Sequence, residues 1–418
     1  MNIAILLVSR TGEKRRTSLT SSWFKTLSSQ VQAYFRQQSG GRVECRFVVF
    51  EWLELSITSE QWWKAGPSVG DEVRKQAAIA YGFDEHQFDR YIIVIDDLTS
   101  RLGVTDYKTD TRIAAIDATP ALVAHELGHA FGAHHTKLET PDGPSEYDGP
   151  FCVMGREGGK YSWFDRNLDT MDINANHSAS GPGMCVVSLS QTGWLDIGTH
   201  CKHVASRHDG TVSSTARIAA LNGAPTPGAN TLVGCIVDSY DRFVIEYRSS
   251  QVFWDQGLAG HVPSANGWLV VYRSPLEGAL DALQVASIAV SVGATLKIDT
   301  QGYYPFGGGP LSMSILRVDS SSRSVEFRVE RRVGKAPQHE RTEEILDYLQ
   351  WPILASKNPL KDEGLDQLAI ALNQLRELKR LRRLSGPRLE GELGHAVDEQ
   401  IAKVQQFASQ LTQSSSAK

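Results

Sequence analysis

Residues 124–139 read "AHELGHAFGAHHTKLE" and hold four of the chain's 12 histidines. His125 and His129 are four residues apart, so on a helix their imidazoles lie one turn apart on the same face. Two imidazoles placed in this way can bind one zinc ion. Glu126 stands between them, in the general-base position of an H-E-x-x-H motif. The pattern therefore predicts a helix that carries a zinc site.

A third ligand is predicted from the glycine that follows. Gly132 can adopt a left-handed conformation, which would end the helix and turn the chain back. We expect that turn to bring His135 to the metal, while His134 fits no ligand position and is expected to be a neighbour. Three protein ligands leave the fourth coordination position for water, which is typical of a catalytic zinc site. The alternative is a helix that carries histidines by chance, and the length of the pattern H-E-x-x-H-x-x-G-x-x-H disfavours it.

The ends of this helix and a later methionine complete the local prediction. Thr119 is a suitable N-cap and Pro120 a suitable first helical residue, so we expect a helix over residues 120–131 that stops at Gly132. Met154 lies nineteen residues after His135, in the segment "CVMG". We expect a tight methionine turn there, although a single buried methionine is more often only core filler.

These motifs resemble those of the metzincin zinc endopeptidases. "HELGHAFGAHH" and "CVMG" also resemble the adamalysin variant of that clan. The segments "EYDGPFCVMG", "LSQTGWL", "RFVIEYRS", "WDQGL" and "GWLVVYR" are similar to gametolysin-like peptidases and, more loosely, to immune-inhibitor-A-type peptidases. The resemblance covers roughly residues 1–330. It implies that Met154 forms an apolar floor beneath the zinc, and that a β-rich module follows the catalytic domain.

Strand and helix patterns alternate along the first hundred residues. We expect strands near residues 3–8, 42–52 and 90–97 and helices over 17–37 and 60–81, which together predict an α/β layer. Residues 111–118 read as a shorter, exposed strand at the sheet edge. Such a strand could pair with an extended peptide, although an ordinary sheet strand is an equal alternative.

Three regions are expected. They are a metzincin-like α/β catalytic domain with an active-site helix (residues 1–200), an antiparallel β-sandwich (201–333) and a C-terminal helical hairpin (334–418). The sandwich is predicted from short strands between Gly, Ser, Asn and Pro turns, and the hairpin from leucine stripes at helical spacing. The hairpin could bind another protein.

Composition excludes several classes of protein. The formal net charge of −5 gives no reason to expect a nucleic-acid partner. No apolar stretch approaches the roughly 20 residues that span a bilayer, and the start lacks the order of a signal peptide. We therefore expect a protein that is cytoplasmic as made, with leaderless export as an alternative. No prosegment is visible before the first strand. The five cysteines argue against a disulfide framework and leave room for one bridge.

The function expected from these residues is zinc-dependent hydrolysis of peptide bonds. One catalytic zinc would activate a water molecule, Glu126 would be the general base, and the substrate would be a protein or peptide. Asp165, Asp169 and Asp172 could hold calcium, although a solvated loop is the preferred interpretation. Two alternatives stay open: a catalytically silent protein-binding module on the same scaffold, and a leaderless proteolytic toxin or effector.

Overall fold

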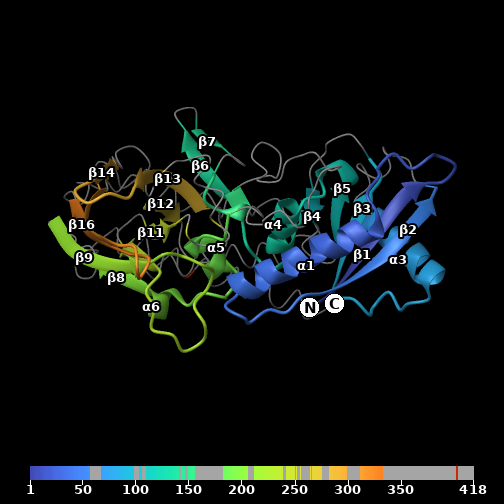
Figure 1. Cartoon of the computed structure of the whole chain (residues 1–418), viewed down its shortest axis with the longest axis horizontal. Coiled ribbons are helices and arrows are strands. Elements are labelled where there is room, and N and C mark those ends of the chain that lie inside the picture. Colours follow the sequence, from blue (N-terminus) through green and yellow to red (C-terminus); the bar gives the residue numbers. More distant parts are fainter. Residues whose placement is uncertain are drawn as a thin grey trace.

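The first sheet is built by the alternating strands and helices at the start of the chain. It has five strands in the order β2-β1-β3-β5-β4 (Figure 1). Their bounds are β1 Asn2–Arg10, β2 Arg46–Leu55, β3 Arg90–Ile95, β4 Gly103–Thr105 and β5 Asp110–Ala114. β1 pairs in parallel with β2 and β3, β3 in parallel with β5, and only β4 runs antiparallel. The coarse expectation of an α/β fold is confirmed, and the described residues form several sheets and few helices.

The structure is a computed structural model, and it describes only part of the chain. The described residues are 1–56, 67–97, 103–105, 110–140, 143–145, 149–155, 182–205, 211–238, 242–249, 251, 255, 264, 266–274, 282–298, 311–332 and 402. The predicted helical hairpin (334–418) and the possible calcium loop with Asp165, Asp169 and Asp172 lie outside these residues, so both stay predictions. In the described segments, no helix combines the length and apolarity that a membrane crossing needs.

Helices cover both faces of this sheet. α1 (Ser21–Gln38) and α4 (Pro120–Ala130) share one apolar core with alternate residues of β1, such as Ile3 and Ile5. α3 (Pro67–Tyr81) packs on the other face, against Ala4 and Leu6. Successive side chains of a strand point to opposite faces, so the continuous apolar run of β1 is buried by helices on both sides.

The expectation that residues 111–118 form an edge strand is wrong. β5 lies between β3 and β4, and residues after Ala114 form a 3₁₀ helix, Ala115–Asp117. The edge position belongs to β4. Three residues are too few to show the alternation from which a strand is predicted, so β4 left no recognisable pattern.

Two further sheets follow. One has seven strands in the order β7-β6-β13-β12-β11-β10-β8, and the other four in the order β14-β15-β16-β9. Their bounds are β6 Thr136–Thr140, β7 Gly143–Ser145, β8 Cys201–Ala205, β9 Thr211–Ala219, β10 Gly234–Asp238, β11 Arg242–Arg248, β12 Trp268–Ser274, β13 Ala282–Ala289, β14 Thr295–Ile298, β15 Leu311–Asp319 and β16 Ser324–Arg332. Residues from both sheets share one core, with Phe243 and Ile245 on one side and Phe327 and Val329 on the other.

The pairing is mixed rather than purely antiparallel. β8 runs parallel to β10, and β6 runs parallel to β13. In each pair, β8 or β6 comes from an earlier part of the chain than its partner. β6 directly follows the histidine segment. A parallel pair needs a long crossover and not a hairpin, so turn signals alone could not predict these two pairs.

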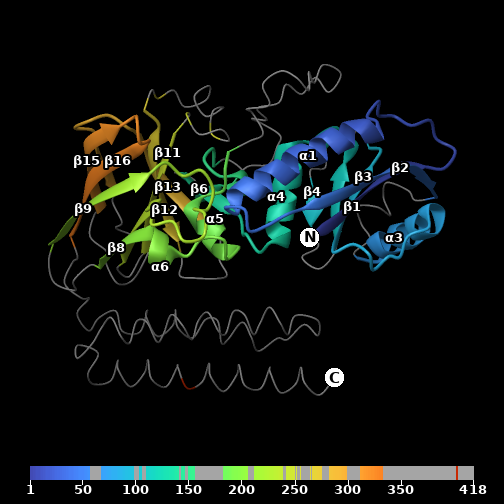
Figure 2. The same cartoon turned by 60° about the horizontal axis from the view of Figure 1, so that its bottom comes forward.

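The first core continues into the downstream sheet. It runs from Ile3 through the residues of α4 to Trp268 and Ala282. In Figures 1 and 2, β1–β5 gather at one end of the molecule and β8–β16 at the other, with α4 between them. The boundary expected at residue 200 stays a prediction, but β6 and β7 precede it in sequence and pair within the downstream sheet.

Candidate metal centre

The site is built on α4, whose start follows the predicted capping residues. The Thr119 hydroxyl oxygen accepts a hydrogen bond from the backbone N–H of Leu122 at 3.1 Å, and Pro120 opens the helix. α4 buries every residue from Pro120 to His129. Because α4 is buried on all sides, its position is fixed by the elements packed around it. The histidines on α4 therefore have little freedom to move.

The helix ends in the turn that Gly132 permits. Gly132 has a φ of +93°, its N–H donates to the carbonyl of His129 (2.9 Å), and the N–H of Ala133 donates to the carbonyl of Gly128 (3.0 Å). This pair of bonds is the Schellman arrangement, in which a left-handed residue reverses the chain after a helix. The reversal returns His135 toward the helix, as the sequence predicted.

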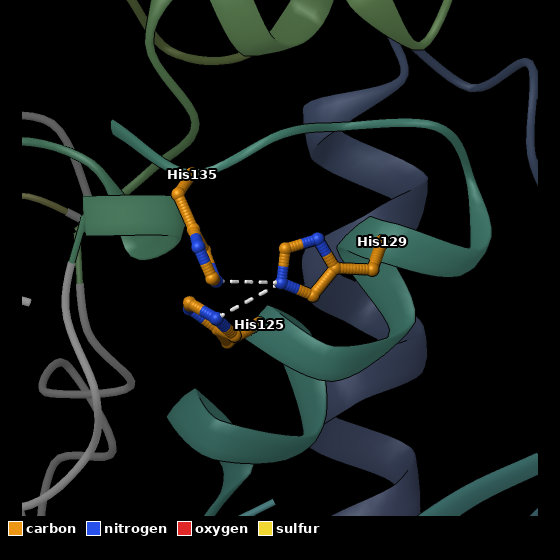
Figure 3. A group of neighbouring side chains, drawn as sticks. All are labelled: His125, His129 and His135. Atoms are coloured by element: carbon orange, nitrogen blue, oxygen red, sulfur yellow. Dashed lines mark hydrogen bonds between the residues drawn. The ribbon is translucent and has the colours of Figure 1, made fainter. Parts of the chain in front are cut away.

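The three predicted ligands meet at one point, as Figure 3 shows. Nε2 of His129 lies 3.2 Å from Nε2 of His125 and 3.0 Å from Nε2 of His135. Two nitrogens bound to one zinc at 2.0–2.1 Å and tetrahedral angles are about 3.3 Å apart. The three imidazoles therefore fit a zinc ion with little rearrangement, and their donor type suits it.

Backbone carbonyls determine which imidazole nitrogens carry hydrogen. Nδ1 of His125 lies 2.8 Å from the carbonyl oxygen of Val153, and Nδ1 of His129 lies 2.9 Å from that of Ala133. A carbonyl oxygen can only accept, so both Nδ1 atoms donate. In the neutral rings the two Nε2 atoms then present lone pairs to each other, in a buried position. Protonating both rings would instead place two positive charges together. A cation between them removes the conflict, and carbonyl-oriented imidazoles are typical of metal ligands.

Met154 lies directly beneath α4. It is fully buried in the 3₁₀ turn Val153–Gly155. A Cβ on Gly128 would come within 2.4 Å of the Met154 sulfur, so this glycine lets the turn approach the helix closely. The turn also supplies the Val153 carbonyl that orients His125.

Two buried thiols connect this turn to helix α5 (Val186–Gln191). The sulfurs of Cys152 and Cys185 lie 3.4 and 3.2 Å from the Ser188 hydroxyl. Burial opposes ionisation of Cys152, but hydrogen bonds from Cys185, Ser188 and Thr136 outweigh it and lower its pKa to about 5. Burial raises the pKa of Cys185. All five cysteines are free thiols, and this pair ties the methionine turn to α5.

The downstream sheet holds the third histidine. Thr136 is the first residue of β6 and pairs with Ala282 of β13, whose N–H donates to the carbonyl of His135 at 3.1 Å. The methionine turn also lies against β6, because a Cβ on Gly155 would come within 2.6 Å of the Thr136 carbonyl oxygen. The position of His135 therefore depends on β13 as well as on the Gly132 turn.

Glu126 and His134 also belong to the histidine segment, and neither is part of the ligand group. Glu126 is buried on α4 beside His125 and does not belong to the group of converging ligand atoms. His134 is half-buried, and its backbone N–H donates to the Gln191 side chain at 3.0 Å. Within the described residues, His125, His129 and His135 form the one cluster that could hold a metal ion.

The sequence did not reveal the groups that orient the ligands. The carbonyls of Val153 and Ala133 are backbone atoms, which every residue has, so no residue type marks them. Glu246 and Arg248 on β11 are completely buried as well. Two charged residues in one short strand were a weak signal, since polar residues on a strand usually face solvent.

Comparisons with known proteins add little. No family model matches the chain, and no curated protein matches it. A solved structure described as "Structure of a chaperone-substrate complex" shares 16% sequence identity with it, over 37% of this chain and 27% of that one, with a TM-score of 0.24. This chain thus spans about a quarter of that chain's length, and so low a TM-score carries no argument.

Proposed function

We propose that this chain is a zinc-dependent endopeptidase of the metzincin type. His125, His129 and His135 would hold one zinc ion and Glu126 would be the general base. The observation that carries the proposal is the meeting of three Nε2 atoms, two of them on rings whose Nδ1 atoms donate to carbonyls. One zinc ion bound by the three Nε2 atoms would use their lone pairs together, which supports a metal as the occupant of this buried group.

Three features around the histidines support the same assignment. The helix ends in a glycine turn that returns the third histidine, a buried methionine turn lies beneath the helix, and an antiparallel strand, β4, forms one edge of the sheet. The family resemblance of the sequence implies a methionine floor of this kind. Together they favour a catalytic zinc site over a structural one, which would have four protein ligands.

The chemistry divides between the metal and Glu126. Zinc, when bound, would acidify a coordinated water and polarise the carbonyl of the peptide bond. The Glu126 carboxylate accepts the proton as the water oxygen bonds to the carbonyl carbon. It then gives that proton to the leaving nitrogen as the carbon–nitrogen bond breaks. The products are a new carboxyl terminus and a new amino terminus.

β4 is the proposed place for an extended substrate. Among the described strands, it pairs with β5 on one side and has no strand on the other. It also packs beside α4 (Figure 1). An extended peptide could add to this edge by main-chain hydrogen bonds, which accept many side chains. A protein or peptide is therefore the proposed substrate.

The test measures metal and hydrolysis separately. We expect one zinc per chain in the wild type and in His134→Ala, and none in His129→Ala, by elemental analysis of purified protein. The wild type should cleave members of a broad peptide library, lose this activity with a zinc chelator and regain it with zinc. Equal zinc in all three proteins would refute the site. Zinc without cleavage of any peptide would favour the silent binding module.

A further inference from the structure

Three charged side chains of the downstream sheet region are completely buried. Glu246 and Arg248 lie on β11 and are 0% exposed, and Asp255 is 1% exposed. Nη2 of Arg248 lies 2.8 Å from Oδ1 of Asp255, and its Nη1 lies 3.5 Å from Oε1 of Glu246. Burying three ionisable side chains is energetically unfavourable, and apolar side chains of similar volume often give equal or greater stability. A reason other than stability is therefore needed for this cluster.

The three side chains of this cluster form hydrogen bonds with the backbone of residues 183–186. Arg248 donates to the carbonyls of Gly183 (3.0 Å) and Met184 (3.1 Å). Asp255 accepts from the N–H of Gly183 (3.1 Å), and Glu246 accepts from that of Val186 (2.7 Å). Four hydrogen bonds thus hold Gly183, Met184 and Val186, and two of them come from the charged guanidinium of Arg248. Bonds of this kind are shorter and stronger than those between neutral groups.

Residues 183–186 contact the methionine turn, which orients His125. The carbonyl of Gly183 accepts from Arg248 and also from the N–H of Val153, at 3.4 Å. The carbonyl of Val153 in turn accepts from Nδ1 of His125, at 2.8 Å. A continuous chain of hydrogen bonds therefore runs from the buried arginine to a predicted metal ligand.

A packing contact follows the same route. The methyl carbon of Met184 lies 3.3 Å from where a Cβ of Gly128 would be, and the Met154 sulfur lies still closer to the same point. Movement of residues 183–186 would therefore reach α4 through side chains as well as through the Val153 carbonyl. Protein interiors are packed too tightly to absorb such movement locally.

We propose that Glu246, Arg248 and Asp255 form a positioning cluster for the metal site, which acts on His125 through Gly183 and Val153. This inference rests on the proposed function, because it concerns the affinity of the same three histidines for zinc. Groups that orient a ligand's imidazole typically change metal affinity 10–100-fold when they are removed. The cluster would thus make the downstream sheet part of the metal site.

The test uses the full chain and two buried arginines. Arg248→Lys keeps the charge, but one ammonium cannot reproduce the planar fork that spans two carbonyls and a carboxylate. The matched control is Arg331→Lys, because Arg331 is also buried (1% exposed) and lies on β16, against the ring of Phe243. Zinc affinity is measured by competition with a chromophoric chelator. The visible absorption of the Co²⁺-substituted protein reports the geometry of the site, and unfolding of the metal-free proteins reports stability.

We expect Arg248→Lys to bind zinc about 10–100-fold more weakly and to show an altered cobalt spectrum. Arg331→Lys should lose stability but keep both the affinity and the spectrum. Unchanged affinity and spectrum in Arg248→Lys would overturn the inference while leaving the proposed function intact. Equal weakening in both variants would also overturn it, because the effect would then be one of general stability.

A second variant keeps the test decisive if Arg248→Lys does not fold. Asp255→Asn retains the oxygen that accepts from Gly183 but removes the charge that faces Arg248. A smaller loss of zinc affinity is expected, with a cobalt spectrum altered in the same sense. Wild-type affinity and an unaltered spectrum in this variant would count against the inference. Failure of the wild type itself to bind zinc would instead refute the proposed function.

Discussion

A single carboxylate separates metal binding from hydrolysis in the proposed site. Glu126 neighbours His125 on α4, yet it lies outside the converging group of ligand atoms. Its proposed task is to move a proton, and glutamine has nearly the same shape but cannot accept one. Substitution at this position therefore tests the chemistry without dismantling the site.

Glu126→Gln should bind zinc as the wild type does and lose hydrolysis. The expected decrease in kcat/KM is about 10²–10⁴-fold, the usual contribution of a general base. Elemental analysis and a peptide-cleavage assay on the same preparation measure both properties. Wild-type turnover in this variant would remove Glu126 from the mechanism.

Burial of Glu246 predicts a pH dependence of stability. Its pKa is raised from 4.5 to about 8, mainly by burial, although the charge of Arg248 opposes the shift. The folded protein then holds this proton more tightly than the unfolded chain does. The stabilising contribution is complete below about pH 4.5 and is lost as the pH rises toward about 8.

Glu246→Gln should remove this dependence. Between these pH values the wild type should lose unfolding free energy relative to the variant, in denaturant titrations of metal-free protein. Glu330→Gln is the control, because Glu330 lies exposed on β16. Parallel pH profiles for the wild type and Glu246→Gln would show that Glu246 does not carry the effect.

The ligands and the groups that orient them differ in how well sequence reveals them. Metal binding requires imidazole side chains, and the chain reversal requires a glycine. Residue type and spacing therefore predicted the positions of His125, His129, His135 and Gly132. The carbonyls of Val153 and Ala133 could not be predicted, because every residue carries one. Arg248 acts through a fold that brings it beside Gly183, and no local pattern contains that information.

The end of α4 shows how one element sets ligand geometry. Gly132 has a φ of +93°, and a Cβ there would meet only the Gln191 carbonyl oxygen, at 3.8 Å. Space is therefore available, and the difficulty for other residues is conformational. A non-glycine residue in a left-handed conformation costs about 1–2 kcal/mol.

Gly132→Ala should lower stability by about 1–2 kcal/mol and weaken zinc binding, because relaxation of the turn would displace His135. Gly193→Ala is a matched control, with a φ of +72° and nothing within 4 Å of the added Cβ. It should lose similar stability and keep its zinc affinity. Equal zinc affinities in both variants, measured by chelator competition, would show that the turn does not position His135.

Strand prediction succeeded where patterns were long and failed where they were short. β1 and β3 are apolar runs, and their burial on both faces followed from that composition. β4 has three residues and no pattern, so β5 was wrongly placed at the sheet edge. The parallel pairing of β6 with β13 joins distant segments, which hairpin signals cannot reveal.

The described sheets end before the predicted helical tail. β16 ends at Arg332 and pairs with β9 and β15 in the four-stranded sheet. Among the residues that the structure describes, both large cores are formed by residues before that point. Folding and metal binding should therefore not require residues 335–418.

A chain that ends at residue 334 should fold and bind one zinc. Circular dichroism, thermal unfolding and elemental analysis check this expectation. A chain that ends at residue 323 is the control, because it lacks β16 and should be insoluble or unstable. Loss of metal from the 334-residue chain would place the tail within the structural core.

The contact between Ala282 and His135 has a consequence for the order of events during synthesis. The predicted metal ligands lie within eleven consecutive residues, yet β6, the strand that begins directly after His135, pairs with a strand about 150 residues later. Contacts of such long sequence separation form slowly and late. A nascent chain on the ribosome would thus expose all three histidines well before β13 emerges. Zinc capture at full affinity should then wait until β13 has emerged and paired with β6, and until that step the growing chain would lack the proposed hydrolytic activity.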